Sequence, residues 1–211
     1  MAFSFNGSSS RIEATSTPIT AEPLTMACWF NPANVSAGGA LMAVGNSSTN
    51  NRFQLTAAGD VAGDPISISS VGTSTVTATS STSFTANTWH HAAAVCASTT
   101  SRSIYLNGGG KNTNNSPMTL TGINNIMTGA RWQGGSRGFF FNGRIAEVAI
   151  WNIALTDDEI LSLSKGFAPS LIRPMNLRFY NRCLRISRDL SGGRALTETN
   201  ITNYDHPRIY G

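Results

Sequence analysis

Pairs of carboxylates are the residues that could catalyse glycoside hydrolysis. The two groups flank the scissile bond and stand roughly 5–5.5 Å apart in retaining enzymes. On one strand such a pair would stand at alternating positions. Between Glu22 and Glu147 the chain carries only Asp60 and Asp64, each beside a glycine in an expected turn. Glu147 stands alone on its expected strand. We therefore expect no catalytic residue and no enzyme, and we expect Glu147 to accept hydrogen bonds from backbone or arginine groups under a helix.

Metal ligands are also sparse. Calcium takes about six to eight oxygens, several of them from carboxylates, whereas the polar loop at residues 46–51 offers only Asn, Ser and Thr. We expect no metal ligand set and no cofactor, with a weak Ca²⁺ site that uses Asp60 and Asp64 left open. His90 and His91 are neighbours, so on a strand they point to opposite faces and cannot share a zinc ion. One should pack inside near Trp89, and the other should face solvent.

A mixture of aromatic and polar residues between positions 132 and 140 suits carbohydrate recognition, in which rings stack on sugars and polar groups fix their orientation. The candidate carbohydrate-binding residues are Trp132, Arg137, Phe139 and Phe140. If the segment from 138 to 141 is a strand, at least one of its phenylalanines points away from the core. The alternative is that these rings are buried against the edge of the fold or a neighbouring subunit.

Positive charge is concentrated at the C-terminal end. Residues 165–211 carry eight Arg or Lys against three Asp or Glu, whereas residues 1–164 carry seven against eight. The arginines alternate with apolar residues instead of clustering, which favours packing on a protein surface over nucleic-acid binding. The candidate partner-docking residues are Arg173, Arg178, Phe179, Tyr180, Arg182 and Arg185. We therefore expect a jelly roll at 1–167 and a docking arm at 168–211.

The elements that must position these residues are mainly strands. Apolar alternation broken by turn residues predicts strands at 2–5, 11–13, 24–31, 39–44, 52–57, 65–71, 75–79, 89–97, 102–106, 125–128, 138–141 and 144–151. Short loops make most pairings antiparallel, which predicts an all-β fold of two packed sheets. Trp29 and Trp89 lie in such alternating strands and should be largely buried.

The segment from Phe141 to Ile160 predicts a turn, a strand and one short helix near 156–165. Strict alternation places Ile145, Glu147, Ala149 and Trp151 on one face of the strand and Ala146, Val148 and Ile150 on the other. Thr156 with Glu159 three residues later forms a capping box at the start of the helix, and Gly166 is a natural end.

Composition limits the cellular setting. Three cysteines are too few for a disulfide framework, so Cys28 and Cys96 are expected to be buried and reduced. The chain has no apolar run of about 18 residues, and we expect no membrane contact. The first residues lack a basic segment followed by an apolar one, so we expect no secretory signal peptide.

Five segments occur together in an order and spacing that resemble a known family: 5–10, 24–32, 88–95, 104–108 and 141–160. They are similar to laminin-G-like domains of the concanavalin A-like lectin/glucanase superfamily. The resemblance implies a jelly-roll sandwich, with a calcium ion near the rim in many members. Asn142 and Ala146 stand where relatives often carry Asp, so the usual anionic ligands are missing.

The motifs at 189–193 and 205–211 resemble C-terminal extensions of laminin-G-like proteins in tailed bacteriophages. This resemblance implies a capsid decoration or virion surface protein, made in the host bacterial cytoplasm. Its partners would be other virion subunits, further copies of itself, and glycans. The leading expectation is a non-catalytic virion protein that displays a lectin-like sandwich toward glycans or a host surface. The alternative is a free-standing carbohydrate-binding lectin.

Overall fold

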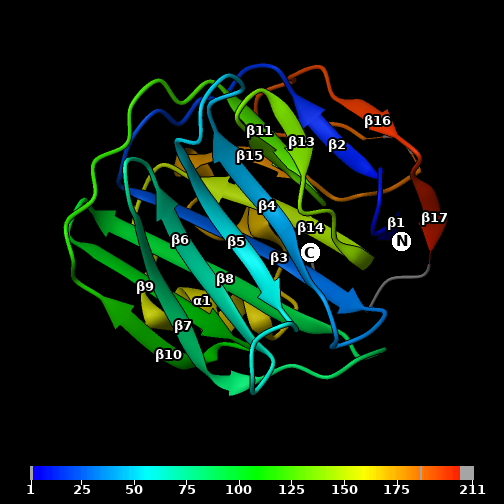
Figure 1. Ribbon diagram of the computed structural model, residues 1–211, viewed down its shortest axis with the longest axis horizontal. Helices are drawn as coiled ribbons and strands as arrows, with labels where there is room; N and C mark the ends of the chain where they lie inside the picture. The colour runs from blue at the N-terminus through cyan, green and yellow to red at the C-terminus, as the bar shows by residue number, and fades with distance from the viewer. Residues whose placement is uncertain (1, 186, 205–211) are drawn as a thin grey trace.

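Two large antiparallel sheets pack face to face and form the body of the protein (Figure 1). The computed structural model describes residues 2–185 and 187–204. The first sheet runs in the order β10 (Gly109–Asn114), β9 (Ser101–Leu106), β8 (His90–Ser98), β3 (Leu24–Pro32), β14 (Asn142–Trp151), β1 (Ala2–Asn6) and β17 (Thr202–Tyr204), and β15 (Leu177–Asn181) also pairs with β14. The all-β sandwich predicted from the strand pattern is confirmed.

The second sheet runs in the order β16 (Thr197–Thr199), β2 (Arg11–Ala14), β11 (Asn125–Thr128), β4 (Gly38–Gly45), β5 (Arg52–Ala58), β6 (Pro65–Val71) and β7 (Thr75–Ser83). A separate hairpin joins β12 (Arg131–Gln133) to β13 (Ser136–Gly138). The predicted strand at 138–141 is wrong, because Phe139 has a φ of +54° and only Phe140 forms an isolated bridge, to Ala40.

The main core lies between the sheets and follows from the alternation of side chains along each strand. Phe30 of β3, Phe53 of β5 and Ile68 of β6 are fully buried there. Burying each such side chain stabilises the fold by about 1.5–3 kcal/mol. A smaller core on the outer face of the first sheet holds Trp151 beneath the helix residue Ile160. The central strands of the first sheet are therefore apolar on both faces.

The α-helix of the described residues, α1 (Asp157–Ser164), begins as the sequence predicts. Thr156 Oγ1 accepts a hydrogen bond from the Glu159 amide at 3.3 Å, and Glu159 Oε2 accepts one from the Thr156 amide at 2.8 Å. Two short 3₁₀ helices follow, η1 (Pro169–Leu171) and η2 (Pro174–Asn176). Among the described residues, the helices are all too short or too polar to cross a membrane.

A β-bulge in β14 overturns the predicted faces of that strand. The pairing of β14 with β3 shifts register between Ala146 and Ala149, and Glu147 has a φ of +52°. An extra residue in a strand reverses the alternation beyond it. Ile145 therefore shares the main core with Val148, instead of facing the same side as Ala149.

The outer face of the first sheet is shielded from solvent, although the alternation of side chains along its strands predicts that one histidine is exposed there. Both histidines are buried: His90 packs in the core 5.6 Å from the Phe30 ring, and His91 lies on the outer face 5.4 Å from the Trp29 ring. The prediction that one histidine faces solvent is wrong because α1 and its neighbours cover this face. Trp29 and Trp89, predicted to be largely buried, are both partly buried and neither is fully exposed.

The C-terminal region extends both sheets of its own chain. β15 pairs with β14, β16 with β2, and β17 with β1. The expected boundary near residue 167 therefore does not separate a jelly roll from an independent arm within 168–204. Leu177, Phe179 and Tyr180 are buried against their own chain, whereas Leu171, Met175 and Leu190 are exposed. Residues 205–211 lie outside the described residues.

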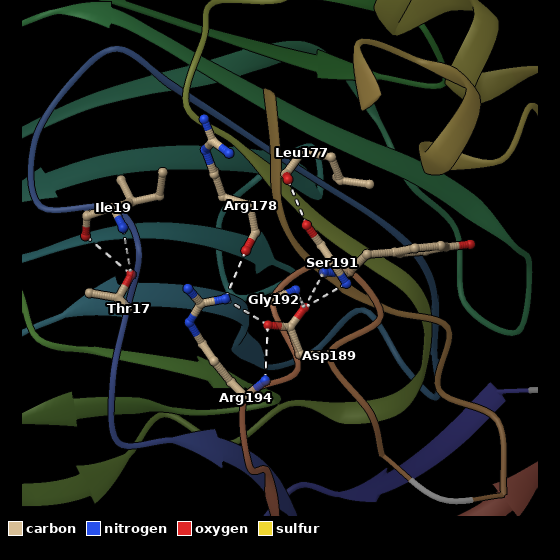
Figure 2. Close-up of polar contacts among 9 residues, drawn as sticks. Thr17, Ile19, Leu177, Arg178, Asp189, Ser191, Gly192 and Arg194 are labelled. Atoms are coloured by element: carbon tan, nitrogen blue, oxygen red, sulfur yellow. Dashed lines mark hydrogen bonds and ion pairs between the residues drawn. The ribbon is translucent and has the colours of Figure 1, made fainter. Parts of the chain in front are cut away.

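A buried carboxylate holds the loop after β15 in place (Figure 2). Asp189 Oδ1 accepts hydrogen bonds from the amides of Tyr180, Ser191 and Gly192 at 3.1–3.2 Å. Asp189 Oδ2 pairs with Arg194 Nη1 at 2.7 Å, and that guanidinium also donates to the Arg178 carbonyl. The motif at 189–193 is thus a structural element that fastens this loop to β15.

Candidate functional site

A surface cavity of about 500 Å³ with a mixed lining lies between the β12–β13 hairpin, β2, the loop after β4 and the start of β11. Its lining includes Glu13, Ser47, Asn124, Trp132 and Arg137. Carboxylate, amide, hydroxyl and guanidinium groups therefore surround one aromatic ring. The hairpin contacts β4 and β11, and lies near their labels in Figure 1.

The hairpin exists because of two adjacent glycines. Gly134 and Gly135 have φ values of +57° and +85°, which a two-residue turn of this kind requires at both positions. This turn pairs Gln133 with Ser136 and Trp132 with Arg137. Directly opposite residues share a face, so Trp132 and Arg137 point the same way, toward the cavity.

Arg137 connects the ring to the carboxylate. Its guanidinium carbon lies 4.1 Å from the Trp132 ring centroid, a cation–π arrangement. The same guanidinium donates from Nε and Nη2 to the two Glu13 oxygens at 3.1 and 3.2 Å. Arg11 adds a second, more distant positive charge, with its Nε 3.7 Å from Glu13 Oε2. Glu13 is thereby fixed with its two oxygens at the cavity wall.

The four predicted carbohydrate-binding residues separate into two groups. Trp132 and Arg137 line the cavity, while Phe139 and Phe140 do not. Phe139 packs against Arg131, whose guanidinium carbon lies 4.3 Å from its ring centroid. Phe140 lines another pocket, of about 210 Å³, at the end of the sandwich near Asn142. The left-handed backbone at Phe139 interrupts the alternation of side chains along the strand, so the Phe139 and Phe140 rings do not line the Trp132 cavity.

Sequence reasoning missed Glu13, Ser47 and Asn124. Glu13 occupies the outward position of a short strand, between buried Ile12 and Ala14. A charged residue between two apolar residues of a strand is the one sequence feature from which Glu13 could have been chosen as a candidate site residue. Among the described residues, Glu13 is the one carboxylate in the lining, so the cavity lacks the two facing carboxylates that glycoside hydrolysis uses.

Glu147, the carboxylate predicted to have a structural role, lies in the interior at the β14 bulge. It accepts a hydrogen bond from the Tyr180 hydroxyl, and Arg182 Nε lies 3.8 Å away. Burial raises the pKa of Glu147, and the Tyr180 and Arg182 contacts oppose that shift. The predicted structural role is consistent with these contacts, although β15 and the segment directly after it, not the helix, supply them.

The described residues contain no cluster of three His, Cys, Asp or Glu that could hold a metal ion. In the polar loop at 46–51, Asn46 Oδ1 already accepts the amides of Ser48 and Thr49 at 2.8 and 3.0 Å. This oxygen therefore stabilises the turn of the loop through hydrogen bonds to the loop's own backbone.

The predicted docking residues also fall into two groups. Phe179 and Tyr180 are buried within their own chain, so they offer little surface to a partner. Arg173 pairs with Glu159 of α1, and Arg182 and Arg185 are exposed. Arg178 is half-buried. The arginines, not the aromatic residues, thus form the accessible part of this set.

Comparisons with known proteins agree with this architecture. The family described as the concanavalin A-like lectin/glucanases superfamily matches residues 6–161. A search of curated protein sequences found no match. The chain is similar to the CBM40 of the Ruminococcus gnavus IT-sialidase, solved with α2,3-sialyllactose, at 17% identity and a TM-score of 0.59 over 72% of this chain and 93% of that one.

Two further structures have the same fold. Domain 4 of AbnA, an extracellular arabinanase from Geobacillus stearothermophilus solved with arabinotriose, has 20% identity and a TM-score of 0.65 over 77% of this chain and 76% of that one. A heptameric SAP-like pentraxin from Limulus polyphemus has 13% identity and a TM-score of 0.63 over 94% and 95%. At these identities the likeness establishes the fold alone.

Proposed function

The chain belongs to the concanavalin A-like lectin/glucanases superfamily, and from that premise we propose that it is a non-catalytic carbohydrate-binding domain whose site is the cavity at Trp132. The observation that carries the proposal is the Trp132–Arg137–Glu13 arrangement. It places an aromatic ring beside two fixed carboxylate oxygens and several neutral polar groups. Such a combination suits a sugar, which has apolar ring faces and hydroxyl edges.

Two of the structural neighbours support this proposal, because they were solved with oligosaccharides bound. The cavity volume of about 500 Å³ lies within the roughly 300–1,000 Å³ typical of small-ligand sites. A single carboxylate in ion pairs with arginines suits hydrogen bonding to hydroxyl groups better than proton transfer.

A glycan array followed by calorimetry tests the proposal. The intact protein should bind a defined set of saccharides, and Trp132→Ala should weaken that binding by at least tenfold, because the stacking surface is lost. Phe167→Ala is the matched control, since Phe167 is an aromatic residue with 46% exposure that does not line the cavity. The proposal fails if the protein binds no saccharide, or if Trp132→Ala binds as well as the unaltered chain.

We further propose that the domain is displayed on a virion surface, together with other capsid subunits and further copies of itself. The resemblance of the 189–193 motif to phage proteins supports this placement. So do the surface arginines Arg182 and Arg185, which would pair with carboxylates on a partner in a salt-sensitive way. Arg173 already pairs with Glu159 of its own chain. The alternative is a free-standing lectin.

Sedimentation of the protein with capsids of candidate phages distinguishes these roles. A virion component should co-sediment, and substitution of Arg182 and Arg185 by Gln should weaken the association, most clearly at low salt. A protein that binds glycans but no capsid at any salt concentration would be a free-standing lectin.

A further inference from the structure

Two arginines converge on one neutral oxygen on the outer side of the second sheet. Arg52 of β5 donates from Nε to Gln54 Oε1 at 2.8 Å, and Arg131 of β12 donates from Nη1 to the same oxygen at 2.8 Å. The remaining printed partners are also neutral: the Asn50 carbonyl for Arg52 and Gln133 Oε1 for Arg131. In the described part of the chain, no carboxylate pairs with either guanidinium.

Both positive charges are partly withdrawn from water. Arg52 is 7% exposed, and Arg131 is half-buried with its Nε enclosed and without a hydrogen-bond acceptor. Burial and, as a smaller contribution, the nearby charge of Arg131 together lower the pKa of Arg52 to about 10. Burial also lowers the pKa of Arg131. Two like charges in this setting repel each other and destabilise the fold.

The unused hydrogen-bonding capacity indicates what would relieve this repulsion. Each guanidinium carries five N–H groups, and the bonds described above use two from each. The Phe139 ring covers one face of Arg131, which leaves the guanidinium edges for hydrogen bonds. An oxyanion would accept several of these N–H groups in charge-assisted bonds and would neutralise the pair.

The arginine pair and the Trp132 cavity lie on opposite faces of the same hairpin strand. Side chains alternate along β12, so Arg131 and Gln133 point away from the face that carries Trp132. The Trp132 face looks toward Glu13 on β2, and the Arg131 face looks toward Gln54 on β5. A saccharide that contacts both sites would therefore have to reach around the edge of the hairpin.

We propose that Arg52 and Arg131 form an oxyanion site, and that it receives the carboxylate or sulfate group of an acidic saccharide. The saccharide part of this inference rests on the proposed function, whereas the oxyanion site itself does not. The ligand class thereby narrows from carbohydrates in general to sugars that carry an acidic substituent.

The direct test measures binding of sodium sulfate, D-glucuronate and D-glucose at constant ionic strength, balanced with sodium chloride. Sulfate and glucuronate should raise the melting temperature above its value in chloride, and glucose should not act through this site. Arg131→Gln should reduce the affinity for both anions at least tenfold, and Arg131→Lys should retain part of it. Lys165→Gln, which removes an exposed positive charge at the end of α1, is the matched control.

Gln54→Glu provides a second test that does not depend on losing an arginine. The substituted carboxylate would occupy the position of the shared oxygen and pair with both guanidiniums. We expect a higher melting temperature without ligand and loss of the sulfate effect. The inference is overturned if sulfate stabilises Arg131→Gln or Gln54→Glu as much as the unaltered chain, or if sulfate acts no differently from chloride.

The two proposals can fail separately. Sulfate binding that depends on Arg131, in a protein that binds no saccharide, would support the oxyanion site and contradict the carbohydrate-binding function. Saccharide binding that depends on Trp132 but is equal for acidic and neutral sugars, and unchanged in Arg131→Gln, would overturn the oxyanion site and leave the carbohydrate-binding function intact.

Discussion

The guanidinium of Arg137 lies over the indole ring of Trp132, with 4.1 Å between the guanidinium carbon and the ring centroid. The two residues are cross-strand partners, so the hairpin register itself sets their contact. This geometry holds an aromatic surface and a cationic donor at one wall of the cavity.

Arg137→Ala should weaken saccharide binding about tenfold, because one charge-assisted hydrogen bond is lost and Glu13 loses its nearest partner. Arg137→Lys should recover only part of the affinity, since an ammonium cannot pair bidentately with a carboxylate. Calorimetric titration with the best saccharide from the array measures both. Unchanged or tighter binding in Arg137→Ala would show that the side chain covers the ring and takes no part in recognition.

Asp189→Ala should lower the free energy of unfolding by about 3 kcal/mol. The substitution removes the buried carboxylate that accepts hydrogen bonds from Arg194 and from three backbone amides (Figure 2). Asp189→Asn should cost less, since one amide oxygen remains. Urea unfolding measures the difference, and Asp60→Asn at an exposed position is the control. Equal stability of Asp189→Ala and the unaltered protein would contradict the structural role of the motif.

Thr156→Ala should lower the free energy of unfolding by about 1 kcal/mol through loss of the helix cap. Glu159→Ala removes the reciprocal bond of the same capping box, so the two substitutions should be non-additive. A double-mutant cycle from denaturant unfolding measures this coupling. Simple additivity would mean that the two side chains act independently.

Protonation of His91 should make the protein less stable in mild acid. Burial lowers the pKa of His91 to about 3, well below the usual 6.5 of a histidine side chain. The unfolded chain therefore binds more protons between these values, and stability is lost as the pH falls from 6.5 toward 3. This one group should contribute a loss of about 2 kcal/mol at pH 5.

His90 acts in the same direction, because burial also lowers its pKa. His91→Gln should therefore flatten the dependence of unfolding free energy on pH between 7 and 5 without removing it entirely. An identical slope in His91→Gln and the unaltered protein would exclude His91 as the source.

Phe179→Ala should lower the free energy of unfolding by about 3–5 kcal/mol, because Phe179 is 1% exposed within the main core. Arg178→Ala, at the half-buried neighbouring position, should change stability far less. Thermal and urea unfolding measure the two variants. If Phe179→Ala unfolds like the unaltered protein, β15 does not belong to the core and a separable C-terminal arm becomes the better description.

Local patterns in the sequence determined most of the strands, the helix and its cap. The capping box at Thr156 could be predicted because its residues lie within one turn and interact through nearby backbone. Strand alternation likewise depends on neighbours, and it correctly predicted the two-sheet sandwich. It did not predict the bulge at Glu147 or the left-handed Phe139, because nothing in the local pattern marks them.

Only the tertiary structure decided which residues share a site. Glu13 and Arg137 are 124 positions apart and meet because the separate hairpin packs beside the sheet that contains β2, a tertiary relation that local sequence does not set. The same holds for the C-terminal residues. Their apolar content showed that they must cover something, but the choice between their own sheets and a partner depends on edges that exist only after folding.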